Sequence, residues 1–332
     1  MWVCNSAALD AAHLADAPPE QVERDGDGEM TGRLYRLDGW FANVLPREPL
    51  DLVAVGNELL SLGITGVTDM TPYRDTSELD TIRAAVEAGE LPQRVVISGA
   101  PALDRAGLEP LEIGPAKVIV DDAFPPDPDE LARAVATAHD RGLPVALHCA
   151  SRLGVVLALG ALETAGGRKG DRIEHGAVIP PELFPRLRAI GATVVTQPAF
   201  VHSRGDRYLT DVEPVDQPHL WRCRSLIDNG IEVGFGSDAP HGPLDPWTAI
   251  EAAATRRTQC GRSLGEGERL PAAAALDRYL TPPRDPGGAP RRVAVGAPAD
   301  LCLLHLPIAD ALAAPRADHV RATVISGVIQ RV

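Results

Sequence analysis

The 332-residue sequence predicts an α/β fold, a (β/α)8-type barrel in which one strand is unaccounted for. Seven short runs rich in Val, Ile and Ala alternate with helical stretches, which is typical of βα units around a parallel sheet. Several runs end on a polar residue, and in a barrel the carboxyl ends of the strands converge on one mouth, where the chemistry is built. No glycine-rich phosphate loop follows any run, which disfavours a doubly wound nucleotide-binding sheet.

The predicted strands follow one another along most of the chain. They cover residues 65–69, 94–99, 117–121, 144–148, 172–175, 192–197 and 232–238. Helical segments lie between them, such as residues 128–142 and 180–191. The second of these begins with prolines and ends at Gly191, which suits the first turn and the end of a helix. The sequence therefore contains seven βα units.

The C-terminal part of the sequence has a different pattern. Residues 291–306 and 320–332 predict antiparallel strands, separated by a helical turn near residues 308–314. The Pro- and Gly-rich residues 280–292 predict a linker before them. We therefore expect a catalytic domain over residues 1–290 and a C-terminal β segment over residues 291–332. Two such strands bury too little surface to form a domain alone, so we expect partner strands from elsewhere.

The composition excludes several classes of protein. A formal net charge of −14 argues against a nucleic-acid partner and against binding to an anionic membrane surface. No apolar run approaches the length of a membrane span, and the first residues lack the pattern of a signal peptide, so we expect a soluble cytoplasmic protein. Five cysteines without CxxC spacing disfavour a disulfide framework or a structural zinc knuckle.

Four polar residues on the predicted strands suggest a metal site. His148, His175 and Asp238 stand at strand ends. Lys117 opens a fourth strand, and Asp121 on the same strand is an equally polar rival. Taken singly, each has an ordinary interpretation as a core histidine, a turn aspartate or a strand-edge lysine. Together, imidazoles and a carboxylate are the ligands that hold Zn or a similar divalent ion while one position stays open for water. Such an ion lowers the pKa of the water, and Asp238 could pass the water's proton to the leaving group.

Four motifs, in order along the chain, resemble the amidohydrolase superfamily and most closely amidohydrolase family 3, the group that includes N-substituted formamide deformylase-like enzymes. They are "DRIEHG" with His175, "VVTQP" with Gln197, "GFGSDAP" with Asp238 and "GAPADLCLL" with Asp300. The resemblance extends from Trp2 to the C-terminus. It implies a distorted (β/α)8 barrel and a small β-sandwich made from both termini. It also implies metal-dependent hydrolysis of a C–N bond, in an amide or cyclic amide, by metal-activated water.

The resemblance implies a role for each candidate residue. His148 and His175 correspond to metal ligands, and Asp238 to a ligand that also moves a proton. Lys117 corresponds to a strand lysine that is carboxylated in many members and bridges two ions. The expected cofactor is therefore a divalent metal with zinc as the first choice, as one or two ions, and whether Lys117 is carboxylated stays open.

The sequence departs from the family pattern in its N-terminal part. Members carry a His-x-His pair on the first barrel strand, whereas none of the nine histidines here forms such a pair. The opening residues "WVCNSAAL" resemble a segment that lies well after this strand in relatives. We therefore expect an N-terminally truncated barrel that lacks its first strand. The alternative is a catalytically silent amidohydrolase-like chain without the His-x-His ligands.

Four further residues are candidates for substrate binding. His202, Arg204 and Tyr208 follow the predicted strand at residues 192–197, and His241 follows the turn after Asp238. The alternative is a solvated loop for the first three, and a position beside the site or on the surface for His241. The expected partner is a small-molecule amide, and self-association into a homo-oligomer is left open.

Overall fold

The computed structural model describes residues 2–14, 18–45 and 50–330. Contacts between residues divide the chain after Asp51 into two compact units, residues 1–51 and residues 52–332. The strands predicted from the sequence all lie in the second unit, which is described first.

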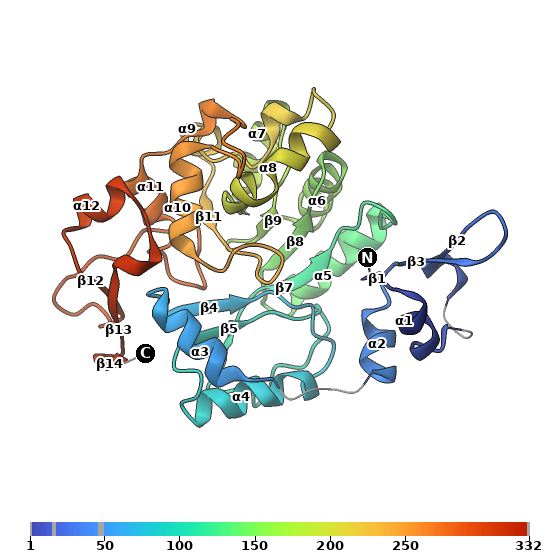
Figure 1. Ribbon diagram of the computed structural model, residues 1–332, viewed down its shortest axis with the longest axis horizontal. Coiled ribbons are helices and arrows are strands. Elements are labelled where there is room, and N and C mark those ends of the chain that lie inside the picture. The colour runs from blue at the N-terminus through green and yellow to red at the C-terminus, as the bar shows by residue number, and fades with distance from the viewer. Residues whose placement is uncertain (1, 15–17, 46–49, 331–332) are drawn as a thin grey trace. The chain divides into compact units, whose positions relative to one another are not determined.

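Each of the seven predicted strands is present, and each runs parallel to its neighbours. They are β4 (Gly66–Asp69), β5 (Arg94–Ile97), β7 (Ala116–Ile119), β8 (Val145–Cys149), β9 (Arg172–His175), β10 (Thr193–Thr196) and β11 (Val233–Phe235). One sheet holds β4, β5 and the short β6 (Glu112–Ile113), and a second holds β7 to β11 in chain order. The backbone N–H of Lys117 donates to the carbonyl of Gly99 at 2.7 Å and so joins β7 to the end of β5. The predicted α/β fold class is confirmed, since parallel βα units follow one another along the chain (Figure 1), and the barrel that lacks a strand stays a prediction.

Helices follow most of these strands, and local sequence sets their ends. The side chain of Asp127 accepts two backbone N–H groups at the start of α5, and Gly191 ends α7 with a φ of 75°. Within the described ranges, every helix is too short or too polar to span a lipid bilayer. The helices around the strands are α3 (Leu52–Ser61), α4 (Asp80–Glu87), α5 (Pro128–Asp140), α6 (Arg152–Ala165), α7 (Phe184–Ile190), α8 (Ala199–Asp211), α9 (Arg224–Asp228), α10 (Pro246–Thr255) and α11 (Ala272–Asp277).

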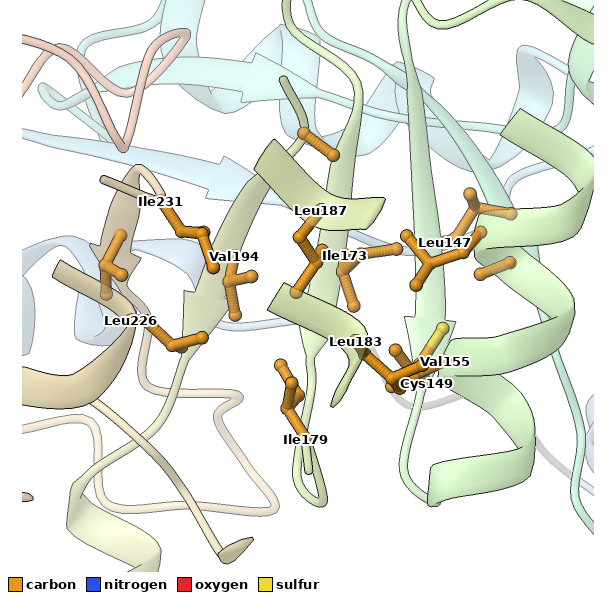
Figure 2. Packing of buried hydrophobic residues seen from close by; sticks show 14 of the residues in the cluster. Leu147, Cys149, Val155, Ile173, Ile179, Leu183, Leu187, Val194, Leu226 and Ile231 are labelled. Carbon is orange, nitrogen blue, oxygen red and sulfur yellow. The ribbon is translucent and has the colours of Figure 1, made fainter. Parts of the chain in front are cut away.

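The largest hydrophobic core of the described residues lies between strands β7 to β11 and the helices α5, α6, α7, α9, α10 and α11. Figure 2 shows side chains of both layers projecting toward one another, among them Leu147, Ile173 and Val194 from the strands and Val155, Leu187 and Leu226 from the helices. On β9 the residues alternate between two faces, so Ile173 packs under the helices while Arg172 and Glu174 point the other way. The core thus leaves the opposite face of the strands for polar side chains.

β4 and β11 are the outermost of the parallel strands. Among the described residues, neither pairs with a strand on its outer side. The predicted linker lies against both of them. Thr68 Oγ1 on β4 donates to the carbonyl of Pro283 at 2.9 Å, and a Cβ placed on Gly234 of β11 would lie 2.4 Å from the carbonyl oxygen of Pro286. The linker therefore covers part of both edges through side-chain and close backbone contacts.

The C-terminal residues form an antiparallel sheet of β12 (Leu301–Leu304), β13 (Val320–Ile325) and β14 (Val328–Gln330), with α12 (Ile308–Ala313) after β12. The strand predicted over residues 291–306 forms only in its last part, because Gly296 has a φ of 87° and Pro298 cannot donate to a ladder. Thr323 Oγ1 donates to the carbonyl of Leu60 at 2.6 Å, so α3 covers the sheet on one side. The sheet lies in the same compact unit as the parallel strands, and the two domains expected from the sequence stay a prediction.

Residues 1–51 form a small unit that the sequence analysis does not anticipate. It contains β1 (Trp2–Val3), α1 (Ser6–Ala11), β2 (Val22–Arg24), β3 (Met30–Leu34) and α2 (Asp38–Val44), with the strands antiparallel in the order β1–β3–β2. Its core includes Leu34 and Phe41. The turn between β2 and β3 has the sequence "DGDG", in which Asp25 accepts the backbone N–H groups of Asp27 and Glu29. Asp-Gly between short strands is a hairpin signal.

Candidate active site

The carboxyl ends of the parallel strands surround a cavity of about 1070 Å³. Since parallel strands bring their carboxyl ends to one side, residues far apart in the sequence meet there. The structure brings together all four residues proposed as metal ligands, and their roles as ligands stay predictions. They are Lys117 on β7, His148 on β8, His175 at the end of β9 and Asp238 after β11.

The two histidines are in contact. Their ring centroids lie 4.5 Å apart and their planes are nearly perpendicular, at 75°. Burial lowers the pKa of His148 to about 3, and the neighbouring His175 adds to this effect. His148 is therefore neutral at pH 7, which is the form in which an imidazole nitrogen binds a metal ion.

The backbone at two of the four residues has an unusual conformation. His175 has a φ of 68° and Asp238 a φ of 55°, both in the left-handed region that favours glycine. Such a conformation costs a non-glycine residue about 1–3 kcal/mol and is concentrated at functional sites. His175 is the last residue of β9, Asp238 lies three residues after the end of β11, and both side chains line the cavity.

Lys117 and its rival Asp121 occupy different environments. The Lys117 side chain is buried, and burial lowers the pKa of its amine, while the charges of Glu174 and Asp238 oppose that shift. Asp121 accepts two backbone N–H groups of the following turn, at 2.7 and 3.1 Å. It is not among the residues that line the cavity. The geometry therefore favours Lys117 as the site residue on β7.

Gln197 is a residue of this site to which the sequence analysis assigns no role. It is 2% exposed, lies just after β10 and lines the cavity. Its Oε1 lies 2.9 Å from Nδ1 of His175. The signal in the sequence is a polar residue at the end of a buried strand, within the motif "VVTQP".

Two further charged residues line the cavity, and neither was predicted from the sequence. Arg172 and Glu174 on β9 pair at 2.8 Å, with only 4% and 6% of their side chains exposed. A nitrogen of the Arg172 guanidinium also donates to Sδ of Met70 at 3.0 Å. Because Glu174 also lies close to Lys117, the floor of the cavity contains paired charges of both signs.

The four candidates for substrate binding are divided by the structure. His241 is exposed and lines the cavity. Helix α8 carries His202, Arg204 and Tyr208, in a segment for which a solvated loop was the alternative expectation. None of the three lines the cavity. Arg204 contacts the site indirectly, since its guanidinium donates to the backbone carbonyl of His241. Their roles in substrate binding stay predictions.

The donor atoms at this cavity are of the chemical types that bind a divalent ion. Within the described ranges, no group of three or more His, Cys, Asp or Glu side chains is placed to hold a metal ion. The His148–His175 pair supplies two imidazoles, and Lys117 and Asp238 line the same cavity. Imidazole nitrogen and carboxylate oxygen are the ligands that zinc takes in hydrolytic sites. The amine of Lys117 becomes an oxygen donor only when it is carboxylated.

Known proteins resemble this chain along most of its length. Residues 2–330 match the model of a family described as "Amidohydrolase family". The protein named "Putative amidohydrolase YtcJ" of Bacillus subtilis (strain 168) is 28% identical over 321 residues, which cover 83% of this chain and 61% of that protein. N-substituted formamide deformylase of Arthrobacter pascens is 25% identical over 342 residues, covering 86% of this chain and 62% of that protein. The chain thus spans about three fifths of the length of these relatives.

Solved structures agree on the fold. The crystal structure of an uncharacterized metal-dependent hydrolase from Pyrococcus horikoshii matches with a TM-score of 0.66 at 22% identity. The match covers 83% of this chain and 63% of that one. At this identity the likeness concerns the fold alone.

Proposed function

The chain belongs to the amidohydrolase family, and from this membership we propose that it hydrolyses a C–N bond of an amide or cyclic amide with a divalent metal ion, which we take to be zinc. The observation that carries the proposal is the contact between His148, held neutral, and His175, at a cavity that Lys117 and Asp238 share. The name of one relative, N-substituted formamide deformylase, supports the choice of amides as the substrate class.

His148 and His175 would hold the ion through ring nitrogens. A bound ion would polarise the carbonyl group of the substrate and lower the pKa of a water molecule. Lys117 would contribute as a carbamate. Its lowered pKa supports this role, because the neutral amine is the form that reacts with carbon dioxide.

Asp238 would move the proton. Its carboxylate lines the cavity and can accept a proton from water and deliver it to the nitrogen that leaves. A C–O bond forms as the C–N bond breaks, so an open-chain amide gives a carboxylic acid and an amine, and a cyclic amide gives one ring-opened molecule that carries both groups. His241, whose backbone Arg204 binds, would contact the substrate from the rim of the cavity.

Removing and restoring the metal tests this function. We expect the purified chain to release amine from at least one member of a panel of N-formyl, N-acyl and cyclic amides. Treatment with a chelator should abolish this turnover, and zinc should restore it. His148→Ala should stay inactive after zinc is added, whereas His305→Ala, at an exposed position that does not line the cavity, should be restored like the original chain. Zinc-loaded chain that hydrolyses no amide would contradict the proposal and favour the silent alternative.

A further inference from the structure

Gln197 makes two contacts through its terminal amide. Oε1 lies 2.9 Å from Nδ1 of His175, and Nε2 donates to the backbone carbonyl of Val195 at 3.2 Å. The Gln197 and His175 side chains are both buried, at 2% and 6% exposed, so water cannot readily replace either contact.

The contact to Val195 determines which way the amide points. A carbonyl can only accept, so it holds the NH₂ group of Gln197 on its own side. The other end of the amide, which faces His175, is then an oxygen that also only accepts. The hydrogen bond at 2.9 Å therefore requires a proton on Nδ1 of His175.

We infer that Gln197 is a positioning residue that fixes His175 in the Nδ1–H tautomer. Nε2 then keeps its lone pair and is the nitrogen available to a metal ion. Histidine in water favours the opposite tautomer, with the proton on Nε2, so a specific partner at Nδ1 is needed to reverse the preference.

This inference rests on the proposed function, because a fixed tautomer matters most if His175 binds a metal. It differs from a purely structural role for Gln197. A side chain that only fills space beside β10 would affect the stability of the chain. It would not determine which ring nitrogen of His175 carries the proton.

The tautomer is measured directly by NMR of the metal-free, full-length chain with ¹⁵N-labelled histidine. The signals of His175 are assigned by their loss in His175→Ala. We expect the proton on Nδ1 in the original chain and a shift toward Nε2–H in Gln197→Met, which keeps the length of the side chain and removes the acceptor. Gln197→Glu keeps an oxygen acceptor and should retain the proton on Nδ1. Thr196→Val is the matched control, because Thr196 is equally buried at the end of β10, does not line the cavity, and its hydroxyl makes no hydrogen bond within the described residues.

Zinc affinity is the second readout. Loss of a hydrogen bond that orients a metal-binding histidine commonly weakens metal binding 10- to 100-fold, and we expect a loss of about this size in Gln197→Met. His175 with its proton on Nε2 in the original chain would overturn the inference, even if Gln197→Met failed to fold. An unchanged tautomer in folded Gln197→Met would also overturn it. If the tautomer shifts but the original chain binds no zinc, the positioning role stands and the proposed function fails. If the original chain and Gln197→Met bind zinc equally with the same tautomer, the positioning role fails while the metal site that the proposed function needs is retained.

Discussion

Glu268→Ala is expected to lower the free energy of unfolding by about 3–5 kcal/mol, because it leaves the buried guanidinium of Arg222 without its carboxylate partner. Oε1 of Glu268 accepts from Arg222 at 2.7 Å, and the two side chains are 6% and 10% exposed. Oε2 accepts the backbone N–H groups of Cys223 and Ser225, each at 3.0 Å, at the start of α9. The substitution thus removes both an ion pair and the cap of a helix, and chemical denaturation measures the loss.

Glu266→Ala is the matched control two residues away. Glu266 also pairs with an arginine, Arg269, at 3.0 Å, but both side chains are about half exposed, so the expected loss is within about 1 kcal/mol. Burial raises the pKa of Glu268, yet hydrogen bonds from Ser225 and Cys223 and the charge of Arg222 hold it below its usual 4.5. The stability that Glu268 contributes is therefore present above about pH 4.5 and is lost as the pH falls through the folded-state pKa. Equal losses for the two alanine variants would contradict this account of the Arg222–Glu268 pair.

Asp238→Asn is expected to lower kcat by about 10²- to 10⁴-fold, the range that a positioned acid or base contributes. An amide keeps the shape of the side chain but cannot accept the proton from water. Because His148 and His175 are retained, zinc binding should fall far less than turnover. Steady-state kinetics of the zinc-loaded chain, with zinc content measured in the same sample, separates the two effects.

Asp104→Asn is the control for this prediction. Asp104 is exposed and does not line the cavity; its carboxylate accepts the backbone N–H of Ala106 at 3.1 Å, and an asparagine oxygen can accept it as well. We expect kcat to stay within a factor of about two or three of the original. Unchanged turnover in Asp238→Asn, or an equal loss in both variants, would remove Asp238 from the proposed mechanism.

The parallel strands could be predicted from the sequence because each is a short apolar run between helical segments. The polar residue at the end of such a run could be identified too, and this is how His148, His175 and Asp238 were found. The small unit at residues 1–51 could not be predicted in this way, since its strands are two to five residues long and lack an apolar run. Its core depends on residues that are distant in sequence, such as Val22 and Phe41.

Residues of the site that act through a partner were harder to predict. Gln197 is informative only once His175 is known to lie beside it, which depends on the pairing of β9 with β10. The place of Arg172 and Glu174 in the cavity could not be predicted from "DRIEHG", because a single sequence does not show which face of β9 points into the cavity. The left-handed backbone at His175 and Asp238 could not be predicted from the residue types either, since neither position is a glycine.

Isothermal titration of the metal-free, full-length chain with zinc tests the central claim most directly, namely that the residues around this cavity form a metal site. We predict at least one zinc ion per chain and binding at least about 100-fold weaker in His148→Ala/His175→Ala, since each substitution removes a ligand. His305→Ala should bind as the original chain does. Equal zinc binding by the original chain and the double variant, or no binding by either, would contradict the claim.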